Sequence, residues 1–131
     1  MNRNGEKLLR VLLVEPGKRP RTVELADTLE AMQQAVGGLI QAIYPFEEPV
    51  ALVCNDEGKL LGLPLNRGLR TEDGTLYDIV CGTFFLCAAP PDGDAFESLN
   101  EEQLARYEKR FHSPEVFLRL GGQIISLPEE P

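Results

Sequence analysis

The segment PLNRGLR, residues 64–70, carries the side chains best suited to chemistry in this sequence. Asn66 offers a hydrogen-bond donor and an acceptor, and Arg67 offers a planar guanidinium group that fits a carboxylate or a phosphate. The proline and glycine of the segment would hold such a loop in one shape. We interpret PLNRGLR as a loop that anchors the fold, with binding of a ligand or partner as the second interpretation.

A second basic loop, EPGKRP, carries Lys18 and Arg19 beside a glycine. It lacks the spacing of a nucleotide-binding loop and does not open a helix, so it is weak evidence for phosphate binding. If PLNRGLR binds a ligand, we expect Arg67 or Arg70 to lie in or beside a concavity near Lys18 and Arg19. The candidate binding residues are therefore Lys18, Arg19, Asn66, Arg67 and Arg70.

No set of residues matches a catalytic arrangement. The only histidine, His112, falls at the expected end of a helix, where a cation complements the helix dipole. Adjacent acids are frequent, but they fall on turns and helix starts, where carboxylates are normally solvated. Asp78, beside an apolar run, is the one acid that merits inspection. We predict no catalytic residue, no metal site and no cofactor, and we favour a non-enzymatic protein while leaving the question open.

The three cysteines indicate thiols in a reducing compartment. Cys54, Cys81 and Cys87 are odd in number, lie inside apolar runs and form no CxxC motif, so we predict buried, unbonded thiols. The N-terminal apolar stretch is only about seven residues long and is interrupted by Arg10, which predicts a strand rather than a signal peptide. No apolar run approaches the roughly 18 residues of a membrane span, so we expect a cytoplasmic protein.

Charge is distributed unevenly along the chain. Residues 1–21 hold six basic and two acidic residues, giving +4, and the rest hold seven basic and nineteen acidic residues, giving −12. The two parts sum to a net charge of −8. An acidic chain lacks the surplus of Lys and Arg that phosphate contacts need, which argues against direct nucleic-acid binding. A local basic cluster could still hold one small anion, although solubility alone explains such a charge.

The residue pattern predicts two helices. Asp27 caps a helix over residues 27–36, with Glu30 in the capping-box position and two glycines ending it. Ser98 and Glu101 form a second capping box for a helix over about residues 99–111. Each helix carries one apolar face at helical spacing, so each is expected to pack on a sheet.

The remaining apolar runs predict strands. The first two strands are expected to form a hairpin, and NDEG is expected to be a tight turn between VALVCN and KLLGL. TEDGT predicts another turn, and the tail, residues 114–131, is expected to contain a late strand or a packing arm. The strands are predicted at residues 7–14, 21–25, 39–44, 50–54 and within 76–88.

These elements predict one α+β domain over residues 1–131, with two main helices and a largely antiparallel sheet. Hairpin-linked strands favour the antiparallel arrangement, because parallel strands need longer connections. The sequence leaves open whether the sheet is partly mixed or curled. Length alone is consistent with one independent core.

Several blocks together resemble one known family. They are VLLVEPGKRPRTVEL, IYPFEEPVALVCNDEGKLLGLPLNRGLR and DIVCGTFFLC, and the similarity covers roughly residues 8–112. The chain resembles an uncharacterised bacterial and phage family, the domain of unknown function numbered thirty-eight forty-six, found in mobile-element genes. The resemblance implies no activity, cofactor or catalytic residue. It implies a genomic setting in which small proteins often bind, inhibit or regulate other proteins.

The leading functional hypothesis is a non-enzymatic binding module from a phage or mobile element, acting on a protein or a small anionic ligand. One alternative is an acidic inhibitor that mimics DNA to block a defence enzyme, which would need carboxylates spaced like phosphates on one face. A second alternative is a small enzyme or binder that acts on a phosphate- or carboxylate-bearing small molecule.

Overall fold

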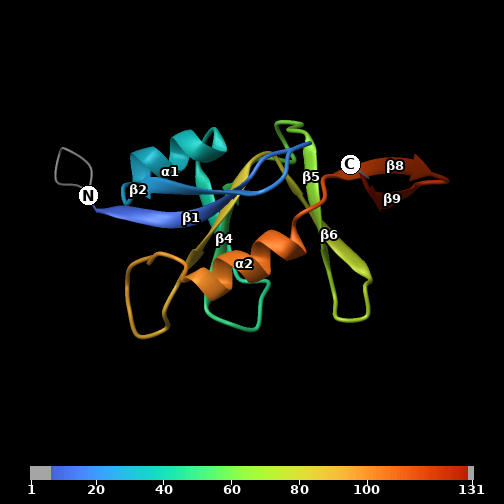
Figure 1. Cartoon of the computed structure of the whole chain (residues 1–131). Helices are drawn as coiled ribbons and strands as arrows, with labels where there is room; N and C mark the ends of the chain where they lie inside the picture. Colours follow the sequence, from blue (N-terminus) through green and yellow to red (C-terminus); the bar gives the residue numbers. More distant parts are fainter. Residues whose placement is uncertain (1–6, 130–131) are drawn as a thin grey trace.

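The computed structural model describes residues 7–129, and its centre is a five-stranded antiparallel sheet (Figure 1). The strand order is β2-β1-β7-β4-β3, so the three inner strands come from distant parts of the sequence. β1 pairs with β2 as the hairpin that the sequence predicts, with Val11 opposite Val23. The strands are β1 Leu8–Val14, β2 Arg21–Ala26, β3 Ile40–Ile43, β4 Val50–Asn55 and β7 Phe84–Ala88.

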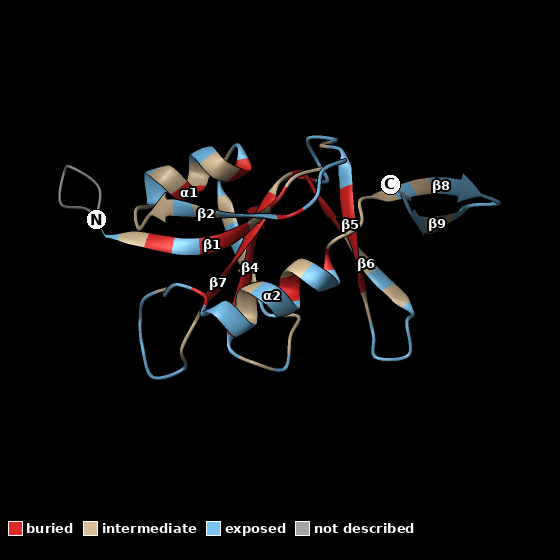
Figure 2. Ribbon diagram, in the orientation of Figure 1, coloured by how far each residue is buried: buried red, intermediate tan, exposed pale blue. Residues whose placement is uncertain are grey.

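The two helices, α1 Leu29–Val36 and α2 Glu101–Arg110, pack on opposite faces of this sheet. Successive strand residues point to opposite faces, and β7 shows this directly. Phe84 and Leu86 pack in the core beside α2, whereas Phe85 and Cys87 pack in the core beside α1. β4 and β7 are covered on both sides, and this favours apolar residues at successive positions, which explains the unbroken runs VALVC and FFLCA (Figure 2).

Two hairpins complete the fold. β5 Leu65–Arg70 pairs with β6 Leu76–Cys81, and this hairpin lies on the same side of the sheet as α2. Its Leu69 and Val80 are buried in the core that α2 also covers. β8 Glu115–Leu120 pairs with β9 Gln123–Pro128 in a second hairpin that extends away from the sheet (Figure 1). The expected late strand in the tail is therefore a complete hairpin.

The α+β prediction with two helices and antiparallel strands is confirmed. Cys54, Cys81 and Cys87 are buried and unbonded, as predicted. Burial raises the pKa of all three thiols, that of Cys87 to about 12, so these thiols stay protonated and unreactive. Within residues 7–129, neither helix is long and apolar enough to span a membrane.

Both predicted helix caps are wrong by one or two residues. Thr28, not Asp27, caps α1, and its side chain accepts a hydrogen bond from the Ala31 N–H. Asn100, not Ser98, caps α2 and forms the capping box with Gln103. Ser98 instead accepts a hydrogen bond from the backbone N–H of Arg10 in β1. Ser, Thr, Asp and Asn all suit the cap position, so residue type alone does not separate neighbouring candidates.

Two predictions about the segment after β4 are also wrong. NDEG does not join two paired strands, because β3 and β7 already occupy both edges of β4. KLLGL therefore has no strand to pair with, and residues 56–62 form a series of turns in which Leu60 is 86% exposed. PLNRGLR is not a loop. The TEDGT turn folds residues 65–70 back against β6, so the segment becomes strand β5.

We predict that Thr28→Ala lowers the free energy of unfolding by about 1 kcal/mol, because α1 loses its cap. Asp27→Ala, one residue earlier, is the matched control and should change the free energy by less than about 0.5 kcal/mol. Urea denaturation of the two variants measures both values. A larger loss in Asp27→Ala than in Thr28→Ala would contradict the assigned cap.

Candidate functional site

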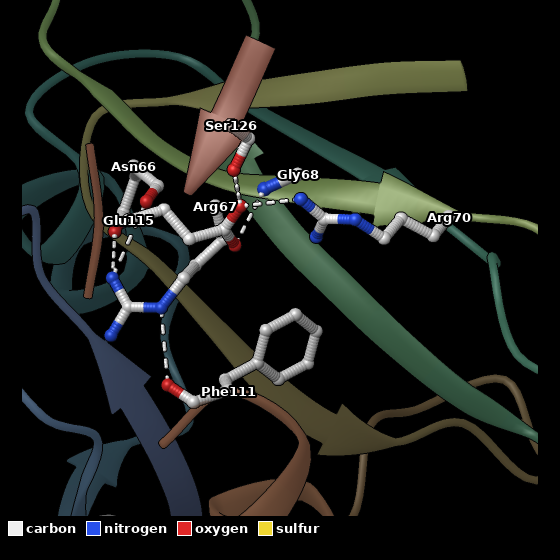
Figure 3. A network of polar contacts seen from close by, with 7 residues as sticks. All are labelled: Asn66, Arg67, Gly68, Arg70, Phe111, Glu115 and Ser126. Atoms are coloured by element: carbon white, nitrogen blue, oxygen red, sulfur yellow. Dashed lines mark hydrogen bonds and ion pairs between the residues drawn. The ribbon is translucent and has the colours of Figure 1, made fainter. Parts of the chain in front are cut away.

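The Arg67 side chain is fully buried, and its guanidinium group is held by protein oxygens (Figure 3). Nε donates to the Phe111 carbonyl at 3.1 Å, and Nη2 donates to the Lys18 carbonyl at 2.6 Å. Nη1 donates to the side-chain oxygen of Asn66 at 2.8 Å and to its carbonyl at 3.3 Å. Burial lowers the pKa of the Arg67 guanidinium, whereas the charge of Glu115 acts in the opposite direction.

Asn66 extends the same network to two more segments. Its Nδ2 donates to the Val14 carbonyl at the end of β1, at 3.0 Å, and to the Gly82 carbonyl between β6 and β7, at 2.9 Å. Gly82 has φ +83°, a conformation that favours glycine, so its carbonyl can be turned toward Asn66. We call Asn66 and Arg67 together the buried anchor, because they join β1, β5, the β1–β2 loop and the end of α2.

Glu115 attaches the C-terminal hairpin to β5 (Figure 3). Its two carboxylate oxygens accept from the Gly68 N–H at 3.0 Å and from Arg70 Nη2 at 2.9 Å. The Ser126 hydroxyl, across the hairpin, also donates to this carboxylate. The Glu115 side chain is only 10% exposed, so these contacts fix the start of β8 against β5.

The five candidate binding residues do not form one cluster. Asn66 and Arg67 lie inside the protein, and Lys18 meets Arg67 through its backbone carbonyl alone. The Lys18 ammonium is exposed, 4.0 Å from a Glu15 oxygen, and Arg19 is exposed. Arg70 lines a concavity. Whether any of the five contacts a ligand stays a prediction.

That concavity has a volume of about 840 Å3 and lies between α2, the β5–β6 hairpin and the loop from β3 to β4. Three arginines line it, one from β5 and two from α2. Aromatic rings from all three segments form much of its wall. We call it the arginine groove and define it by Arg70, Arg106, Arg110, Phe46, Tyr77 and Tyr107.

Glu48 organises one wall of the arginine groove. Its carboxylate accepts hydrogen bonds from Arg106, the Tyr107 hydroxyl and Gln103. The Tyr107 hydrogen bond, with further help from Arg106, lowers the pKa of the Glu48 carboxyl, although burial opposes the shift. Burial and the Glu48 charge raise the pKa of Tyr107. Glu48 therefore stays ionised and Tyr107 stays protonated near neutral pH, so neither is poised for proton transfer.

Arg110 has a different environment from the other two arginines. Its guanidinium carbon lies 4.9 Å from the centre of the Phe46 ring and 5.8 Å from that of Phe111. Arg106 pairs with Glu48 and Arg70 pairs with Glu115, but Arg110 forms no ion pair within residues 7–129. A guanidinium on an aromatic face keeps its N–H edges directed outward, where they can bind a carboxylate or phosphate.

Sequence reasoning missed most of the arginine groove. The periodicity of the second helix places Tyr107 and Phe111 on its buried face, as observed. The same periodicity puts Arg106 and Arg110, four residues apart, on a neighbouring face, which is a pattern that could have identified them. Nothing in the sequence indicates that β5 and the β3–β4 loop supply the opposite walls.

Comparison with known families gives a match over most of the chain. A family model described as "Domain of unknown function (DUF3846)" matches residues 9–112, which is most of the chain. No curated protein and no solved structure matches this chain. The matched region runs from the second residue of β1 to just past α2 and ends before the β8–β9 hairpin.

Loss of the Arg67 side chain should destabilise the fold. We predict that Arg67→Ala lowers the free energy of unfolding by about 3 to 5 kcal/mol, because several buried oxygens lose their donor. The exposed Arg19→Ala is the matched control and should change it by less than about 0.5 kcal/mol. Urea denaturation measures both, and equal stability of the two variants would contradict the anchoring role.

The lowered pKa of Glu48 makes stability depend on pH. A carboxyl group with a depressed folded pKa stabilises the fold above its unfolded value of 4.5, and this contribution is lost as the pH falls through the folded pKa. We predict that wild type exceeds Glu48→Gln in unfolding free energy at neutral pH, and that the difference shrinks below about pH 4. Urea denaturation of wild type and Glu48→Gln above and below about pH 4 measures this difference in unfolding free energy. The exposed Glu24→Gln is the control for the loss of one negative charge.

Proposed function

The chain belongs to the DUF3846 family, and we propose that it is a non-enzymatic binding module whose arginine groove takes the anionic group of a ligand. The single observation that carries the proposal is Arg110, which is stacked on Phe46 and has no ion pair within residues 7–129. Arg70 and Arg106 line the same groove and add positive potential, although each is already paired with a carboxylate.

The lining of the arginine groove supports one class of ligand. Aromatic walls favour a flat or apolar group, and the Arg110 guanidinium favours a carboxylate or phosphate attached to it. The exposed Glu47 and Glu72 at the same groove would repel a chain of phosphates. These features support a compact ligand with one anionic group rather than a nucleic acid.

A binding role is better supported than catalysis. Glu48 is held ionised by three donors, and the Tyr107 hydroxyl is held protonated. A general acid or base needs a pKa near the working pH, and neither of these two groups has one. The small-enzyme alternative therefore has less support than a module that only binds.

Mimicry of DNA has less support. A protein that mimics DNA needs a row of unpaired carboxylates on its surface, but several acidic residues here form ion pairs with Lys or Arg. These acids are Glu15, Glu48, Asp78, Glu97 and Glu115. We also propose a cytoplasmic location and a phage or mobile-element setting, as inferred from the sequence. A small protein that sequesters or senses a ligand is compatible with that location and that setting.

Phenyl phosphate is a suitable probe, because it joins one phosphate to one ring. We predict that it shifts the backbone amide NMR signals of residues around the arginine groove, and that Arg110→Ala weakens its binding about tenfold or more. Arg19→Ala, an exposed arginine outside the groove, should bind as wild type does. Benzyl alcohol, which lacks the charge, should cause much smaller shifts.

Two outcomes would contradict the proposal. One is the absence of shifts around the arginine groove at saturating phenyl phosphate. The other is an equal loss of binding in Arg110→Ala and Arg19→Ala, which would indicate a general charge effect. If neither outcome occurs, mass spectrometry of small molecules that co-purify with the protein would identify which anionic compound it carries.

A further inference from the structure

One face of the β8–β9 hairpin is apolar and exposed. In an antiparallel pair, cross-strand partners lie on the same face, and Val116 faces Leu127 while Leu118 faces Ile125. Leu120 continues this row on β8. We call this surface the hairpin face and define it by Val116 (44% exposed), Leu118 (43%), Leu120 (56%), Ile125 (38%) and Leu127 (49%).

The opposite face of the hairpin carries its attachment to the rest of the protein. Glu115 and Ser126 lie there and are half-buried through the contacts with Gly68 and Arg70. Phe117 and Ile124, also half-buried, have the same orientation as these residues by strand alternation. The polar contacts of Glu115 therefore hold the hairpin in one orientation in which its apolar face is exposed, and Figure 2 colours much of the hairpin as exposed.

An isolated two-stranded hairpin is only marginally stable in water, and exposed apolar surface adds to this cost. Five aliphatic side chains, each about half exposed, present roughly 400 Å2, the size of the largest apolar patch on a typical monomer. Such patches commonly mark sites of association. A stable interface needs about 800 Å2 from each partner, so a partner that used only the hairpin face would bind weakly and reversibly.

Charge indicates which partner fits. The chain carries a net charge of −8, so two copies repel one another over most of their surfaces. The hairpin is an exception, because residues 115–128 contain one acid, Glu115, and one base, Arg119, and are neutral overall. Glu115 is also neutralised locally by Arg70. A neutral, apolar surface is where a second acidic copy can approach most closely.

We propose that the hairpin face is the contact surface of a symmetric dimer, in which it packs against the hairpin face of a second copy of this chain. A two-fold dimer uses the same patch on both copies, and a face without charged side chains adds no repulsion between like charges at the contact itself. The central pair, Leu118 and Ile125, packs against the same pair of the other copy as two sheets pack face to face. The dimer is weak and forms as concentration rises.

Sedimentation equilibrium of the full chain, from about 5 µM to about 1 mM, tests the proposal. We expect the mass to rise with concentration from 14.5 kDa toward twice that value. Leu118→Glu should stay at the monomer mass, with dimer affinity lowered at least tenfold, because it places a carboxylate on each side of the contact. Leu60→Glu makes the same change at an 86% exposed leucine outside the hairpin face and should dimerise as wild type does.

Salt gives a second readout. Added NaCl should tighten the dimer, because it screens the repulsion between two acidic copies while leaving the apolar contact intact. Circular dichroism should show that Leu118→Glu melts like dilute wild type, since its side chain is already 43% exposed. A wild-type mass of 14.5 kDa at every concentration would overturn the proposal and leave the hairpin face to a different protein. Equal loss of dimer in Leu118→Glu and Leu60→Glu would also overturn it.

Discussion

The buried Arg67 guanidinium is the interaction on which the arrangement of the other elements depends. Removing a guanidinium group from water is costly, and the cost is offset only when its N–H groups meet well-placed acceptors. Those acceptors come from Lys18, Asn66 and Phe111, so the loop after β1, strand β5 and the end of α2 must all be in place together. No buried side-chain nitrogen or oxygen in the described part of the chain lacks a partner, so the network is fully satisfied.

The buried anchor also determines where charge appears on the surface. Arg67 fixes the last turn of α2 through the Phe111 carbonyl, and that turn carries Arg110. Three residues further along β5, Arg70 reaches the arginine groove and pairs with Glu115, which holds the C-terminal hairpin. One internal arginine thus positions both surfaces to which we assign binding roles. The arginine groove and the hairpin face differ in chemistry, but they depend on the same strand.

The sequence predicts the fold class because its main features are local. Alternating and continuous apolar runs identify the strands around Val11 and Phe85, and Gly37 ends the first helix as its residue type suggests. Features set by distant contacts are not predictable in this way. PLNRGLR has the composition of a turn, yet pairing with β6 makes it a strand, and β4 has no free edge for KLLGL. The walls of the arginine groove come from three separate segments, which no local pattern reveals.

The two interpretations of PLNRGLR, anchor and binding segment, are therefore not exclusive. Arg67 performs the structural role inside the protein, whereas Arg70, on the same strand, is partly exposed at the groove. Loss of Arg67 would displace α2 and β5 together, so a loss of binding in that variant would report the altered fold rather than direct contact. Arg110 separates the two effects, because its side chain is exposed and contacts aromatic rings rather than buried carbonyls. A ligand-binding role for this protein must therefore be tested at the surface arginines of α2.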